Sequence, residues 1–161
     1  MAEGEFALIR QYLEAVLVKS ASPVGAPTGD HDLYVMLVDA AAQQRDEVAL
    51  RKYAPLAEET ATRIDHKLYM AIAHRAWGVA HCLAGEYAEA DARLNQALKI
   101  FRELDTRWQI GRTWFEFGEL SRAQNKMEAA RENYSRALAA FEEMRAVTDA
   151  TRTRAALEAL G

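Results

Sequence analysis

Histidine and cysteine are the residue types in this chain best suited to metal binding, general-base chemistry or nucleophilic chemistry. His74 and His81 are seven residues apart, so on a helix they share a face two turns apart, whereas helical metal pairs stand three or four residues apart. His31 and His66 stand where helices are expected to begin. The single cysteine, Cys82, lies in an apolar stretch, and its neighbour His81 points about 100° away around a helix. We predict structural roles for all five residues, with no metal, cofactor or catalytic pair.

Other catalytic motifs are missing from the sequence. There is no glycine-rich phosphate loop and no nucleophile elbow. The acidic pairs Glu58–Glu59 and Glu142–Glu143 lie beside arginine and lysine, which is typical of solvated helix surface. We therefore predict that the chain is not an enzyme.

The composition indicates one globular, helical domain. The chain has 161 residues, of which 50% are apolar, and a formal charge of −4. No lysine and arginine excess marks a nucleic-acid surface, and no run approaches the ~20 apolar residues that span a bilayer. No secretory leader is visible, and one cysteine cannot form an intrachain disulfide, so a cytoplasmic location is expected.

The sequence repeats itself at a spacing of forty residues, so that segment 71–110 aligns with segment 111–150. Glycine or asparagine stands at the same turn position in the two copies, as Gly85 and Asn125, and both residues favour the left-handed conformation that ends a helix. Each copy is thus predicted to be a helix, a tight turn and a second helix. Segment 31–70 is a fainter first copy, and Pro55 is expected to kink or split its second helix. The matched residues are Gly78/Gly118, Ala90/Ala130, Ala97/Ala137, Leu98/Leu138, Phe101/Phe141 and Glu103/Glu143.

Two further segments flank the repeats. Residues 1–19 form an amphipathic helix, with apolar residues at helical spacing. Residues 20–30 are a linker of proline, glycine and serine, and residues 31–161 form the repeat domain, which ends in a closing helix. The first helix is expected either to cap the first hairpin or to pair two copies of the chain, with the dimer favoured.

The repeats resemble the tetratricopeptide family, in which a large residue, an apolar residue and a small residue on helix A face alanines and a large residue on helix B. The second copy offers His74, Trp77 and Gly78 with Ala90, Leu94 and Ala97, and the third repeats the pattern from Trp114. The forty-residue unit is longer than the usual ~34 and is similar to the long repeats of bacterial signalling proteins. The resemblance implies an all-α, right-handed solenoid of about three hairpins, with about eight helices and no sheet.

The resemblance also implies a site, because template positions on the A helices of the family line a concave groove that binds proteins or peptides. The groove residues carried over are Arg75, Val79, Cys82, Leu83, Arg112, Phe115, Glu119 and Arg122, together with Asp32, Val35, Asp39, Ala42 and Gln43 of the first copy and Arg152 and Ala155 of the closing helix.

This groove mixes apolar residues with arginines that are expected to face solvent. Arginine pairs with carboxylates in a bidentate manner, so we expect a protein or peptide partner with an acidic group. The chaperone-tail clamp of the family is not expected, because Val79 replaces its asparagine and Glu116 its arginine. The predicted function is a scaffold or regulatory interaction module. The alternative is a sensor for a small molecule or signalling peptide.

Overall fold

The computed structural model describes residues 3–20 and 30–161, and within them the side chains of 8–16 and 32–161. This part of the chain is all helical, with eight α-helices and no strand, which confirms the predicted fold class. The helices are α1 (Glu3–Ser20), α2 (Asp30–Gln43), α3 (Glu47–Arg63), α4 (Lys67–Leu83), α5 (Tyr87–Glu103), α6 (Arg107–Ala123), α7 (Met127–Glu143) and α8 (Val147–Glu158).

The turns between α2 and α8 share one construction. At the centre of each stands a residue with positive φ, at 45, 65, 85, 105, 125 and 145. The next residue donates its backbone N–H five residues back, as from Glu86 to His81 (2.9 Å), a bond that caps the end of the helix. Gly85 and Asn125 confirm the prediction made for their positions, whereas the four other positions hold arginine or aspartate.

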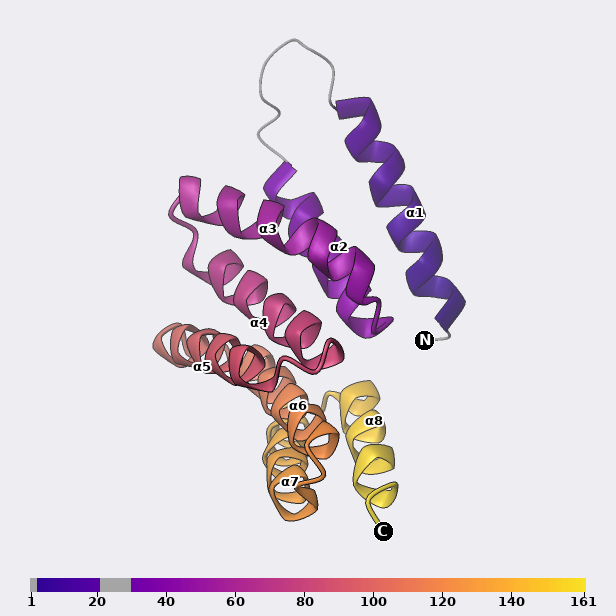
Figure 1. Ribbon diagram of the computed structural model, residues 1–161, viewed down its shortest axis with the longest axis vertical. Helices are drawn as coiled ribbons and strands as arrows, with labels where there is room; N and C mark the ends of the chain where they lie inside the picture. The colour runs from indigo at the N-terminus through magenta and orange to yellow at the C-terminus, as the bar shows by residue number, and fades with distance from the viewer. Residues whose placement is uncertain (1–2, 21–29) are drawn as a thin grey trace.

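The helices pair into hairpins that stack along the chain (Figure 1). α2 pairs with α3, α4 with α5 and α6 with α7, while α8 covers the last hairpin. The first helices of the hairpins also lie side by side, because α4 packs against both α2 and α6. Each of the helices α4–α7 has 17 residues.

Glycines allow the close helix contacts inside the hairpins. A Cβ atom on Gly78 would lie 2.6 Å from the side chain of Leu94, and one on Gly118 would lie 2.4 Å from the ring of Tyr134. Both distances are too short for two carbon atoms. The small and large positions of the repeat pattern therefore face one another as pairs.

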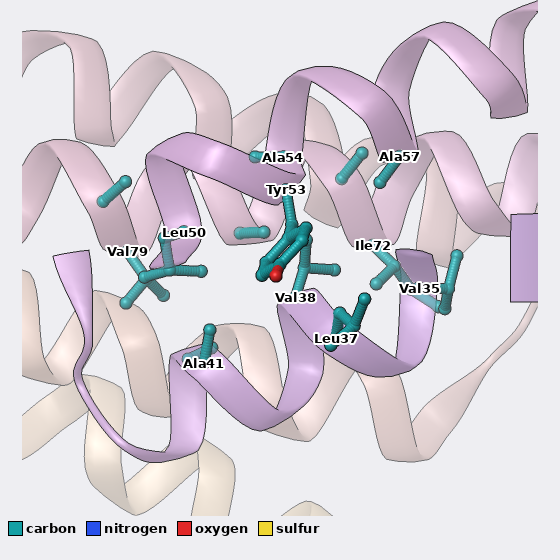
Figure 2. Packing of buried hydrophobic residues seen from close by; sticks show 14 of the residues in the cluster. Val35, Leu37, Val38, Ala41, Leu50, Tyr53, Ala54, Ala57, Ile72 and Val79 are labelled. Atoms are coloured by element: carbon teal, nitrogen blue, oxygen red, sulfur yellow. The ribbon is translucent and has the colours of Figure 1, made fainter. Parts of the chain in front are cut away.

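The first hairpin is continuous despite its proline. α3 runs through Pro55 from Glu47 to Arg63, so the expectation that Pro55 splits this helix is wrong. The buried residues on either side, including Tyr53, Ala54 and Ala57, hold the helix against α2 and α4 (Figure 2).

The N-terminal helix packs on the first hairpin of its own chain. Leu13 is buried there, Arg10 forms an ion pair with Asp46, and Tyr53 donates a hydrogen bond to Glu14. Capping of the first hairpin, one of the two arrangements expected for this helix, is thus present. The predicted linker at 20–30 lies, apart from its two ends, outside the described residues.

Candidate functional groove

The curvature of the stack brings its last helix back toward its second. Arg152 on α8 donates a hydrogen bond to the side-chain oxygen of Gln43 on α2, although 109 residues separate them. Side chains of α2, α4, α6 and α8 thus meet on one concave side of the molecule. The candidate site is built from these side chains.

Asp39 is the first of two acidic positions on this concave side that bind arginine side chains. Its two carboxylate oxygens accept one hydrogen bond from each of two arginines, Arg75 on α4 (3.1 Å) and Arg112 on α6 (2.8 Å). Arg75 also donates to the side-chain and backbone oxygens of Gln109. One carboxylate of the chain therefore connects three consecutive A helices.

Glu116 and Glu119, one turn apart on α6, form the second acidic position. Arg45, in the turn after α2, donates to Glu116 (2.6 Å) and lies 3.4 Å from Glu119. Glu119 also accepts a hydrogen bond from Arg122 (2.9 Å) and another from the hydroxyl of Tyr134. Glu116 therefore anchors a turn of its own chain, which gives a structural role to the residue that replaces the arginine of the chaperone-tail clamp.

Burial and neighbouring charges shift the pKa values of these groups. Burial acts to raise the pKa of Asp39, but the nearby Arg112 and Arg75 outweigh it, so this pKa lies below its ordinary value. Burial acts likewise on Glu119, and Arg45, Tyr134 and Arg122 bring the net pKa shift downward. The pKa of Arg75 falls to about 10, because this guanidinium is buried and Arg112 lies beside it. Asp39 and Glu119 are thus charged in the folded protein at neutral pH.

The solvent exposure predicted for the groove arginines is wrong for Arg75 and Arg112. The side chains of Arg75 and Arg112 are only 3% and 9% exposed, because Asp39 draws both inward. Val79 is fully buried beside Leu50 in the core between the first two hairpins (Figure 2), and Phe115 is buried against Tyr134. Arg75, Val79 and Phe115 therefore lie beneath the concave surface, whereas part of Arg112 reaches it.

The other four predicted residues remain nearer to solvent. Arg122 and Leu83 are exposed, and Cys82 and Glu119 are partly buried. Burial is the first cause that raises the pKa of the Cys82 thiol, so its thiolate is disfavoured. The structure brings Arg75 together with Arg112, and Glu119 together with Arg122.

An open groove of about 1070 Å³ lies over this polar network. α2, α6 and α8 form most of its wall, and Ile9 of α1 closes one side. Three large apolar side chains on this wall, Ile9, Met36 and Trp108, are between 41% and 50% exposed. The remaining lining residues are Asp39, Ala40, Gln43, Gln44, Arg45, Arg112, Thr148, Asp149, Thr151 and Arg152.

Sequence reasoning identified part of this lining and missed the rest. Asp39, Gln43, Arg112 and Arg152 were carried over from the family template, whereas the apolar residues of the wall were not. The wall joins residues more than a hundred positions apart, so no local pattern marks it. The available signal was Trp108, a large aromatic residue at the exposed start of a helix.

The three histidines whose side chains the structure describes have partners within the fold, and His31 lies outside the described side chains. His66 caps α4 and stacks on Tyr69, His74 contacts Arg93 (2.8 Å), and His81 contacts Glu86. In the part of the chain that the structure describes, no group of three or more histidine, cysteine, aspartate or glutamate side chains could hold a metal ion. None of the described helices is long and apolar enough to cross a membrane.

Comparison with known proteins identifies the repeat. Residues 69–143, which hold most of the second and third units, match the family model of the tetratricopeptide repeat. The fold is similar to the crystal structure of BtubC (BKLC) from P. vanneervenii, with a TM-score of 0.69 and 16% identity. That alignment covers 98% of this chain and 66% of BtubC, so this chain spans somewhat less than two thirds of the other. Among curated proteins, no sequence matches.

Proposed function

Because residues 69–143 are tetratricopeptide repeats, we propose that this chain is a protein-interaction module that binds an extended segment of a protein partner in its concave groove. Tetratricopeptide repeats stack into extended concave surfaces that serve for binding. The observation that carries the proposal is the groove itself, where Ile9, Met36 and Trp108 stand exposed beside polar side chains. Exposed apolar residues with a polar rim are typical of protein interaction sites.

The composition of the wall favours an extended segment as the occupant. Trp108 contributes a large surface and is held in place, since its indole N–H donates to Asp149 (2.9 Å) and Arg112 lies 4.7 Å from its ring centre. Tryptophan is enriched among the residues that dominate binding energies. The amides of Gln43 and Gln44 lie on the same wall and suit the backbone groups of an extended chain.

An acidic group on the partner is part of the proposal, and the charges of the site support it. Five arginines lie on the concave side, at 45, 75, 112, 122 and 152, and four carboxylates lie near them, at 39, 116, 119 and 149. Of these five arginines, Arg152 is the one that donates to a neutral amide, that of Gln43, instead of a carboxylate. An acidic partner would neutralise it.

A small signalling molecule is the second candidate occupant. Walls that combine apolar side chains with a few convergent polar groups also hold small ligands. The open shape of the groove, whose apolar residues are nearly half exposed, favours a protein segment instead. The membership in the long bacterial signalling repeats and the cytoplasmic location stay predictions.

A homodimer formed through α1 also stays a proposal. Because α1 already packs on α2 through Leu13, a second copy would use the outward side of this helix. Leu8 and Tyr12 are 67% and 70% exposed there, one turn apart.

Site-specific photo-crosslinking tests the groove as the binding surface. A photoreactive amino acid is placed at Met36 in the groove or at Ala92, an exposed residue on α5, and each protein is illuminated in an extract of the native cell. We expect a specific crosslinked partner from position 36 and none from position 92. The double variant Met36→Ala, Trp108→Ala should capture at least tenfold less partner while its circular dichroism shows that it stays folded. Equal capture from both positions would contradict the proposal.

A further inference from the structure

Arg152 differs from the other arginines of the concave side in its hydrogen-bond partner. Arg45, Arg75, Arg112 and Arg122 each donate to a carboxylate of the chain. The described partner of Arg152 is the neutral amide of Gln43. Among these five arginines, Arg152 is therefore the one that no carboxylate of the described chain meets at hydrogen-bond distance.

The position of Arg152 is fixed by packing. Its guanidinium carbon lies 4.3 Å from the ring centre of Phe115, and Gln43 holds its Nη1 from the opposite helix. Phe115 is buried and is itself held against Tyr134, so the stacked guanidinium rests on a rigid support. Little conformational freedom remains to be lost when a ligand binds.

The electrostatic surroundings of Arg152 favour a single added negative charge. Burial is the main cause that lowers the pKa of this guanidinium, and the nearby Arg45 and Arg112 act in the same direction against Glu116 and Glu119. The charged form of the guanidinium is thus less stable here than in water, and an incoming anion would stabilise it. A monovalent carboxylate matches the single charge of this guanidinium better than a divalent phosphate.

We propose that Arg152 is the specificity-determining residue of the groove and binds a carboxylate of the partner segment, which replaces the amide of Gln43. The inference rests on the proposed function of the groove. An apolar residue of the same segment then packs on Met36 and Trp108, which lie on the same wall. The buried pair Arg75 and Arg112, expected from the sequence to hold the acidic group, is occupied by Asp39.

Peptide selection tests the assignment and requires no identified partner. A phage-displayed library of random 12-residue peptides is selected on the wild-type protein and on three variants. Arg152→Gln removes the charge, and Gln43→Glu supplies a carboxylate from within the chain. Arg154→Gln is the matched control, because Arg154 lies two residues away on α8 and pairs on the surface with Glu142.

The expected result is a peptide motif with one acidic residue next to an apolar residue, selected by the wild type and by Arg154→Gln. Selection on Arg152→Gln and Gln43→Glu should bring the acidic position back to library background. In fluorescence anisotropy, a selected peptide should lose at least tenfold in affinity for Arg152→Gln. Its Asp→Asn or Glu→Gln version should bind the wild type and Arg152→Gln equally, as expected for a coupled pair.

Two contrary results separate the inference from the function beneath it. In the first, the wild type selects peptides that depend on Met36 and Trp108 but show no preference for an acidic residue, or that preference persists in Arg152→Gln. Either observation contradicts the role of Arg152 and leaves the groove as the binding surface. If the wild type selects no peptide, or if the double variant Met36→Ala, Trp108→Ala selects the same peptides, the proposed function fails. Thermal melting of each variant excludes unfolding as the cause of lost binding.

Discussion

Asp39 on α2 and Arg112 on α6 form an ion pair of 2.8 Å across 73 residues of sequence. The helices that carry them are not consecutive A helices, because α4 lies between them and contributes Arg75 to the same carboxylate. The pair therefore ties the first hairpin to the third. Its removal should be felt across the whole stack.

Removal of the Asp39 charge should destabilise the protein strongly. The variant Asp39→Asn leaves Arg75 and Arg112 buried without a carboxylate, and breaking a buried pair in this way costs about 3–5 kcal/mol. Urea unfolding followed by circular dichroism measures the loss. Asp91→Asn, a change on the exposed face of α5, is the control and should stay within ~0.5 kcal/mol of the wild type. A change below ~1 kcal/mol for Asp39→Asn would contradict the prediction.

The same ion pairs should make the fold sensitive to acid. The pKa values of Asp39 and Glu119 lie below their ordinary values in the folded chain, so the unfolded chain takes up protons first as the pH falls. The stabilisation they contribute is complete above their unfolded pKa values, near 4, and is lost as the pH drops through the lower folded values. Unfolding free energies measured from pH 7 to pH 3 should fall across this window. The fall should be smaller in Asp39→Asn, which has lost one of the two groups.

Enlarging the contact glycines should destabilise the hairpins. A methyl group on Gly78 or Gly118 meets Leu94 or Tyr134 at a distance that forces a shift, and overpacking of this kind costs about 1–3 kcal/mol. Melting of Gly78→Ala and Gly118→Ala measures the effect. Gly85→Asn serves as the control, since nothing lies within 4 Å of its added Cβ and asparagine tolerates the left-handed conformation. If all three melt together, the close contacts do not limit stability.

Glycine should stabilise a turn that now holds a strained residue. Arg145 has a φ of 55°, a conformation that is unfavourable for residues with a Cβ by roughly 1–2 kcal/mol. We expect Arg145→Gly to raise the free energy of unfolding by about 0.5 kcal/mol, after allowing for the greater freedom of glycine in the unfolded chain. Arg145→Ala removes the same side chain without relieving the backbone and should not be stabilising. Chemical denaturation of the three proteins side by side distinguishes the two effects.

The outward side of α1 should control self-association if the chain dimerises. Replacing Leu8 and Tyr12 by serine removes the apolar pair without touching Leu13, which packs inward. Light scattering coupled to gel filtration should then show a shift from dimer to monomer with unchanged helix content. A wild-type protein that is monomeric at high concentration would overturn the dimer.

The fold was predictable from the sequence because the contacts that define each hairpin join residues close together in the sequence. Gly78 with Leu94 and Gly118 with Tyr134 are close in sequence, and their small and large sizes alone indicate that they face each other. Of the residues carried over from the template, Asp39, Arg112 and Arg152 line the groove, and Arg75 lies beneath it, paired with Asp39. A family template does not predict which of these side chains form ion pairs with one another.

The exposure of the site was not predictable for that reason. Whether Arg75 faces solvent depends on Asp39, which belongs to another repeat. The curvature of the stack brings the two side chains within hydrogen-bond distance of each other. The template assigns each helix by itself, so it left Arg75 and Arg112 open to a ligand. The contact between Gln43 and Arg152 depends on the same curvature and joins the two ends of the repeat domain.

The turns of all the repeats have the same construction, but the charged residues on the concave side differ from one repeat to the next. Asp39 has Val79 and Glu119 as its counterparts one and two repeats later, and Arg75 has Val35 and Phe115. A duplicated or deleted repeat would leave the turns and glycine contacts of the other units intact, yet it would set arginines against valine or leave carboxylates without a counter-ion. The concave ion pairs therefore require these hairpins in this number and order, although the turns alone would allow any arrangement of them.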